Sequence, residues 1–110
     1  MSSLSTHVLD AVRGEPASGV RVEVYRSAGG EWSAVGGGST DADGRISGLA
    51  PGGVAAGDFR IMFATGDYFD ALGVEYFYPE VVISFRVTED RHYHVPLLLS
   101  PYAFSTYRGS

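Results

Sequence analysis

The 110-residue sequence contains no cysteine, and it also lacks lysine, asparagine and glutamine. Without cysteine there are no disulfides, no thiolate nucleophile and no cysteine-ligated zinc or iron–sulfur site. Without lysine there is no Schiff-base chemistry on a lysine and no Gly-Lys pair of a Walker-type phosphate loop. All eight basic residues are therefore arginines.

Long apolar runs and an excess of positive charge are missing as well. No stretch of about 18 apolar residues is present that could span a membrane. Eight basic against 13 acidic side chains give a net charge of −5, which argues against nucleic acid as a partner because binding it needs a basic face. The first seven residues have neither the basic nor the apolar region of a signal peptide, so we expect a cytoplasmic protein.

The length and composition are those of one globular domain, which we expect to cover residues 1–110. Hydrophobic residues make up 45% of the chain and charged residues 19%. A chain of this size buries only about 60–70% of its unfolded surface. Association with further copies would enlarge that core.

Glycine, proline and an Asp-Gly turn signal divide the chain into short segments rich in valine, tyrosine, isoleucine and phenylalanine. In one of them Val20, Val22 and Val24 alternate with polar residues, the period of a half-buried strand. Seven or eight strands are expected, at residues 6–12, 20–26, 32–35, 45–46, 59–64, 81–87, 92–99 and 103–108. This pattern predicts an all-β sandwich, with the glycines at 36–38 acting as a break.

One segment departs from the strand pattern. Asp67 is a candidate N-cap, apolar residues follow at positions 68, 69 and 72, and Gly73 is a stop signal. We expect one short helix at residues 67–72.

Histidines are the first candidates for chemistry. His92 and His94 lie two residues apart on an expected strand, so their rings should project from the same face. A solvated pair on an edge strand is the simplest interpretation. With His7, which should face away from Thr6 and Val8, they could instead form a three-histidine zinc site. Histidine is also the side chain best suited to proton transfer near neutral pH.

Arg45 follows the turn at residues 41–44 (Asp-Ala-Asp-Gly). Taken alone, the sequence favours a surface ion pair between this arginine and a nearby aspartate. The alternative is a clamp for an anion or carbonyl, because the planar guanidinium can bind two oxygens at once.

Four motifs together resemble a known family. They are residues 4–10 (Leu-Ser-Thr-His-Val-Leu-Asp), 43–45 (Asp-Gly-Arg), 92–101 (His-Tyr-His-Val-Pro-Leu-Leu-Leu-Ser-Pro) and 107–110 (Tyr-Arg-Gly-Ser). In this order and spacing they resemble the 5-hydroxyisourate hydrolases, the enzyme branch of the transthyretin-like family. The resemblance covers essentially the whole chain, and the last motif is the one that separates these hydrolases from transthyretin.

The resemblance implies a transthyretin-like β-sandwich of two four-stranded sheets with one short helix. It also implies a homotetramer, a dimer of dimers, with active sites in the channel at the dimer–dimer interface. The reaction would be hydrolysis of 5-hydroxyisourate to 2-oxo-4-hydroxy-4-carboxy-5-ureidoimidazoline in urate catabolism, with neither cofactor nor metal.

The resemblance further implies which residues form the site. The catalytic set would be His7, Arg45, His94 and Ser110, and the substrate-binding set would be Tyr107, Arg108 and Gly109. His92 would be structural or peripheral.

In such a site a neutral imidazole, of His7 or His94, would take a proton from the water that attacks a ring amide carbonyl. Arg45 or a protonated partner would stabilise the oxyanion. Two points stay open, namely which histidine is the base and whether Ser110 acts through its hydroxyl or a terminal carboxylate.

Other classes of function compete with this interpretation. A transthyretin-type carrier would hold a small aromatic ligand in the channel without chemistry. A structural β-sandwich would leave its histidines on the surface. A zinc hydrolase using all three histidines would lose its activity to a chelator.

Overall fold

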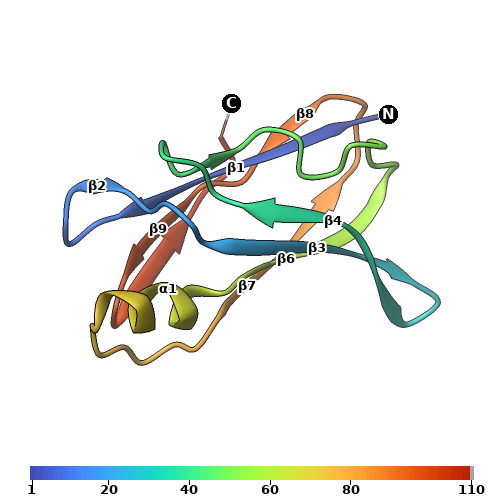
Figure 1. The fold of residues 1–110 in the computed structure, drawn as a ribbon. Helices are drawn as coiled ribbons and strands as arrows, with labels where there is room; N and C mark the ends of the chain where they lie inside the picture. Colours follow the sequence, from blue (N-terminus) through green and yellow to red (C-terminus); the bar gives the residue numbers. More distant parts are fainter. Residues whose placement is uncertain (110) are drawn as a thin grey trace.

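The computed structural model describes residues 1–109, which fold into two facing β-sheets with one helix at an end of the sandwich (Figure 1). The strands are β1 (Ser3–Asp10), β2 (Glu15–Pro16), β3 (Arg21–Ala28), β4 (Glu31–Ser39), β5 (Arg45–Ile46), β6 (Gly57–Phe63), β7 (Val81–Val87), β8 (His92–His94), β9 (Leu97–Ser100) and β10 (Ala103–Thr106), and the helix is α1 (Thr65–Leu72). The predicted all-β sandwich with one short helix is confirmed. Over this range no helix has both the length and the apolar character needed to cross a membrane.

The first sheet is built around β1. Its main path is β10-β9-β1-β2, and β5 and β8 also pair with β1. β8 and β9 run parallel to β1, whereas β2 and β5 run antiparallel to it. The strand expected at residues 92–99 is therefore two segments, separated at Pro96, whose nitrogen has no hydrogen to donate to a ladder. The six segments occupy four strand positions, because β8 and β9 share one edge of β1 and β2 and β5 share the other.

The second sheet has four antiparallel strands in the order β4-β3-β6-β7. Its β4 runs through Gly36, Gly37 and Gly38, where the sequence predicted a break after residue 35. A side chain at Gly36 would collide with the backbone carbonyl of Leu49, and the Gly37 N–H donates to that same carbonyl at 2.9 Å. The glycines therefore admit a close backbone approach and do not end the strand.

The core lies between the sheets and is contributed by alternate residues of each strand. On β1 the buried residues are Leu4, Thr6, Val8 and Asp10. Leu4 and Val8 belong to one hydrophobic cluster with Phe59, Ile61 and Phe63 of β6. The intervening β1 residues, from Ser3 through Ser5 and His7, point to the outer face of the first sheet. The expectation that His7 faces away from Thr6 and Val8 is confirmed.

Helix α1 begins two residues before the predicted start. Asp67 lies in its first turn, and the N-cap position is Ala64, which supplies no side-chain cap. The Gly66 N–H instead donates to the Pro79 carbonyl at 2.9 Å, an approach that leaves no room for a side chain at residue 66. Gly73 ends the helix in the left-handed conformation, with φ of 68°, as predicted.

Asp10 connects the end of β1 to the helix, and we expect its removal to destabilise the fold. Its side chain, only 2% exposed, accepts the N–H groups of Val12 (3.1 Å) and Arg13 (3.0 Å) and the Tyr68 hydroxyl (2.9 Å). Asp10→Ala should lower the free energy of unfolding by about 2–3 kcal/mol, since the buried Tyr68 hydroxyl and two backbone N–H groups lose their acceptor. Urea denaturation measures this. The exposed Asp67, changed to Ala, should cost under about 1 kcal/mol, and an equal loss in both variants would contradict the assignment.

Candidate active site

Strand pairing gathers the candidate residues on the outer face of the first sheet. In the β1–β8 register Ser5 lies opposite His94, and in the β1–β5 register His7 lies opposite Arg45. Residues opposite each other or two apart on a strand share a face. His7, Arg45, His92 and His94 therefore lie on one face, although they come from three separate parts of the chain.

Serine hydroxyls of β1 connect the two histidines of β8. The Ser5 Oγ lies 2.7 Å from His92 Nε2 and 2.8 Å from His94 Nδ1. The Ser3 Oγ lies 2.6 Å from His92 Nδ1. The prediction that both rings project from one face is confirmed. The sequence argument missed the two serines, although their alternation with His7 on a strand was a signal that could have found them.

His94 is held in its neutral form. It is half-buried, and burial is the main cause that lowers its pKa from the ordinary value, followed by the charge of Arg45 and then by His7 and His92. A hydrogen bond with the Ser5 backbone has a smaller, opposite effect. A neutral imidazole at pH 7 can accept a proton, so His94 has the protonation state that a general base needs.

Arg45 is exposed beside these histidines. The Asp41 carboxylate before it accepts the backbone N–H groups of Asp43 and Arg45, both at 2.9 Å, and so it holds the turn. Within residues 1–109 no acidic side chain forms an ion pair with Arg45, so the ion pair that the sequence favoured is not found there. As far as the described residues go, the planar guanidinium can therefore bind an oxygen-bearing ligand.

A cavity of about 280 Å³ opens on this face. Both side chains of the β8 histidine pair and the arginine of β5 line it, in the set Ser5, Thr6, Arg45, Ile46, Ser47, His92 and His94. Among the residues from 1 to 109, no three histidine or acidic side chains are arranged to hold one metal ion. The three-histidine zinc site therefore finds no support in the geometry, whereas a polar organic molecule would meet several donors and acceptors.

Among the described residues that follow β10, Gly109 contacts His94. The Gly109 N–H donates to the His94 carbonyl at 2.8 Å, and a Cβ at residue 109 would lie 2.5 Å from His94 Cδ2. Tyr107 and Arg108 instead line a different cavity. Ser110, predicted to be catalytic, lies outside the described residues. Of the three predicted substrate-binding residues, only Gly109 therefore lies against His94 within one chain.

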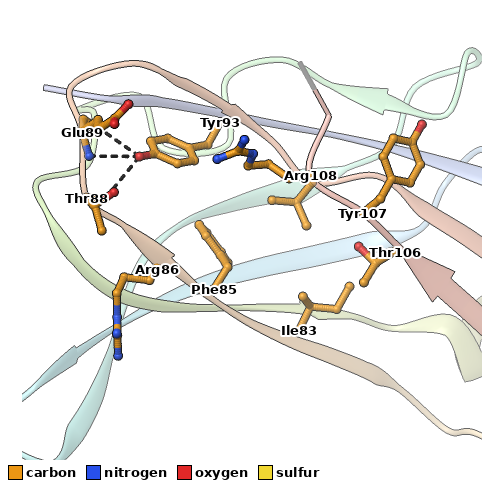
Figure 2. A pocket seen from close by; sticks show the side chains of 10 residues that line it. Ile83, Phe85, Arg86, Thr88, Glu89, Tyr93, Thr106, Tyr107 and Arg108 are labelled. Atoms are coloured by element: carbon orange, nitrogen blue, oxygen red, sulfur yellow. Dashed lines mark hydrogen bonds between the residues drawn. The ribbon is translucent and has the colours of Figure 1, made fainter.

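That second cavity, of about 370 Å³, is the larger of the two, but its lining offers fewer groups suited to proton transfer. Figure 2 shows it between β7, with Ile83 and Phe85, and the segment carrying Thr106 to Arg108. The Tyr93 hydroxyl at its wall already accepts the Thr88 and Glu89 N–H groups, at 3.2 and 3.1 Å. No histidine lines it. The histidine cavity is therefore the better candidate for catalysis.

Comparison with known proteins decides the family. The sequence model of the HIUase/Transthyretin family matches residues 4–109. The chain belongs to this family. A 5-hydroxyisourate hydrolase of Caulobacter vibrioides is 48% identical to this chain over 115 aligned residues, and the alignment covers the whole of both chains.

Solved structures of the family share the fold. The 5-hydroxyisourate hydrolase of Klebsiella pneumoniae superposes with a TM-score of 0.91 at 38% identity, covering 100% of both chains. Sea bream transthyretin in complex with thyroxine gives a TM-score of 0.91 at 34% identity and covers 97% of this chain and 94% of that one. Within the HIUase/Transthyretin family, the fold alone therefore does not separate a hydrolase from a transthyretin in complex with thyroxine.

The low pKa of His94 makes the stability of the fold depend on pH. An unfolded histidine titrates near about 6.5, so between that value and the lower folded pKa the unfolded chain binds more protons. The free energy of unfolding should therefore fall as the pH drops from about 7 through this interval, and stay unaffected by His94 above it. In His94→Asn the fall should be shallower. Urea denaturation between pH 5 and about 7.5 tests this, and parallel curves for both proteins would refute it.

Proposed function

We propose that this chain hydrolyses 5-hydroxyisourate to 2-oxo-4-hydroxy-4-carboxy-5-ureidoimidazoline, the step that follows urate oxidation, as one transthyretin-like domain. The observation that carries the proposal is the neutral His94 beside Arg45 and His7 on one open sheet face. Curated relatives bearing the name 5-hydroxyisourate hydrolase, aligned over the full chain, support it. A carrier needs no such combination of a neutral base and a cationic clamp.

Arg45 and His7 are proposed to bind and polarise the substrate. The flat substrate ring presents carbonyl and N–H groups along its edges, and the guanidinium can contact two such oxygens at once. His7 lies directly opposite Arg45 in the sheet, so both can reach the same bound ring. As charge develops on the attacked carbonyl oxygen, Arg45 is placed to stabilise it.

His94 is proposed as the general base. Its Nδ1 is engaged by Ser5, which leaves Nε2 to face a water molecule. Nε2 takes a proton as the water oxygen bonds to the ring carbonyl carbon, giving a tetrahedral oxyanion. When this intermediate collapses, the ring C–N bond breaks and the nitrogen receives the proton that His94 Nε2 had taken. The carbonyl carbon becomes a carboxylic acid, which loses its proton to water to give the carboxylate. These steps need no cofactor.

The proposed assembly is a homotetramer, a dimer of dimers, with the sites at the dimer–dimer interface. Exposed aromatic side chains near the edge strand β10 support association, among them Phe77 (69% exposed) and Tyr102 (60% exposed). Since a site on a two-fold axis can combine residues of facing subunits, Tyr107 and Arg108 would bind substrate there, and Ser110 would join the catalytic set.

Turnover of fresh 5-hydroxyisourate, generated from urate by urate oxidase, tests the function. We expect decay well above the spontaneous rate, unchanged by a chelator. His94→Ala should lower kcat/KM at least about a hundredfold, since it removes the general base. Light scattering should show the same four-chain assembly for both proteins.

Each other outcome has a defined meaning. Loss of wild-type activity to the chelator would favour the zinc hydrolase. No acceleration by a folded tetramer would favour the carrier, and an active His94→Ala tetramer would remove His94 from the mechanism.

Gly109 gives a second test of the site. In Gly109→Ala the new methyl would lie 2.5 Å from His94 Cδ2, so the ring or the tail must move. We expect kcat/KM to fall about tenfold or more, because small displacements of a catalytic group are costly. Gly52→Ala is the matched control, since nothing lies within 4 Å of the place its new methyl would take. Equal activity of the two variants would show that the tail does not position His94.

A further inference from the structure

An unbroken row of hydrogen bonds leads from His94 to the surface. His94 Nδ1 contacts the Ser5 Oγ at 2.8 Å, the same oxygen contacts His92 Nε2 at 2.7 Å, and His92 Nδ1 contacts the Ser3 Oγ at 2.6 Å. His94 is half-buried, whereas His92 is exposed. The row therefore joins a shielded imidazole to one in contact with water.

The hydroxyl of Ser5 allows this row three arrangements of its protons. A serine hydroxyl has one proton to donate and lone pairs that accept. In one arrangement His94 Nδ1–H donates to Ser5, Ser5 donates to His92 Nε2, and His92 Nδ1–H donates to Ser3. In the second, every donor and acceptor is exchanged, and His94 Nε2 carries the proton. In the third, both rings donate to Ser5, and Ser3 donates to His92 Nδ1. Only the first both leaves His94 Nε2 without a proton, which is the form a general base requires, and gives Ser5 a proton to pass to His92.

We propose that Ser5 and His92 are positioning residues that fix this form of His94 and carry the proton it accepts to the surface. The inference rests on the proposed hydrolase function. It assigns a role to His92, which the family resemblance left structural or peripheral, and to Ser5, which the sequence argument did not single out.

The transfer balances as a relay. A proton from the attacking water enters His94 Nε2. The Nδ1 proton of His94 moves to the Ser5 Oγ as the hydroxyl proton of Ser5 moves to His92 Nε2. Ser5 is unchanged, His94 is neutral again with its proton on Nε2, and His92 is an imidazolium. When the His94 Nε2–H then donates its proton to the departing ring nitrogen, the relay runs back at the same time. His92 Nε2 returns a proton to the Ser5 Oγ as the hydroxyl proton of Ser5 returns to His94 Nδ1, which restores the start.

The surroundings favour placing the positive charge on His92. Within residues 1–109, the groups that disfavour a charged His94 are Arg45 on β5, His7 on β1 and His92 on its own strand, in addition to its burial. His92 has more contact with water, which solvates an imidazolium better than the half-buried position does. Moving the positive charge from His94 to His92 therefore takes it out of a half-buried position and away from the repulsion of Arg45.

Nuclear magnetic resonance of the histidine rings tests the connection without substrate. In protein with ¹⁵N-labelled imidazoles at neutral pH, the ring shifts should place the proton of His94 on Nδ1 and leave Nε2 without one. In Ser5→Ala, His94 should lose its preference for a proton on Nδ1. The same distribution of the His94 proton in both proteins would overturn the relay.

Kinetics separate positioning from a merely structural role. Ser5→Ala should lower kcat roughly tenfold or more with KM changed less than about threefold, and should alter the pH profile of kcat. Ser5→Thr, which keeps the hydroxyl, should restore kcat to within about threefold of wild type. The matched control is Ser84→Ala, an exposed serine on β7 of the other sheet. Equal kcat values for Ser5→Ala and Ser84→Ala would overturn the proposal.

The two experiments fail in distinguishable ways. A Ser5-dependent proton on His94 Nδ1, in a protein that does not accelerate 5-hydroxyisourate decay, would overturn the proposed function and support the hydrogen-bond connection. Fast turnover with a His94 proton distribution that does not depend on Ser5 would overturn the relay alone.

Discussion

Successive residues of β1 point to opposite sides of a single strand, and both the core and the candidate site are built on that alternation. Leu4 and Val8 fill the space between the sheets, while Ser5 and His7 face outward. A slip of one residue would carry His7 into an apolar core and expose Leu4 and Val8 to water. The same hydrophobic burial that stabilises the sandwich therefore also holds the candidate catalytic face in register.

Hydrogen bonding along both edges of β1 fixes that register. β1 is hydrogen-bonded to β8 and β9 along one edge and to β2 and β5 along the other. The buried Thr6 hydroxyl adds a contact of 2.6 Å to the Val95 carbonyl, where β8 gives way to β9. Because His94 and Arg45 arrive from strands paired to opposite edges of β1, their placement next to His7 is a consequence of sheet topology rather than of any local motif.

Features that depend on local interactions could be predicted from the sequence, whereas features that depend on long-range interactions could not. The common face of His92 and His94, the exposed side of His7 and the helix stop at Gly73 depend on periodicity or on one residue's conformation, and all three are confirmed. The course of β4 and the start of α1 depend on distant carbonyls, those of Leu49 and Pro79, and the predictions there were wrong. No local pattern reveals such approaches. The direction of Tyr107 and Arg108 is a long-range property of the same kind.

The sandwich itself is compatible with more than one function, since a hydrolase and a thyroxine-binding transthyretin share it. Function must then reside in the outward positions of β1, β5 and β8. Two histidines of β8 differ there in environment, one shielded beside a guanidinium and one open to water, and one serine hydroxyl contacts both. A ligand carrier would gain nothing from this difference. For a general base, however, a shielded imidazole joined through a hydroxyl to an exposed one combines a neutral resting form with a solvated group that can take up the charge of the accepted proton.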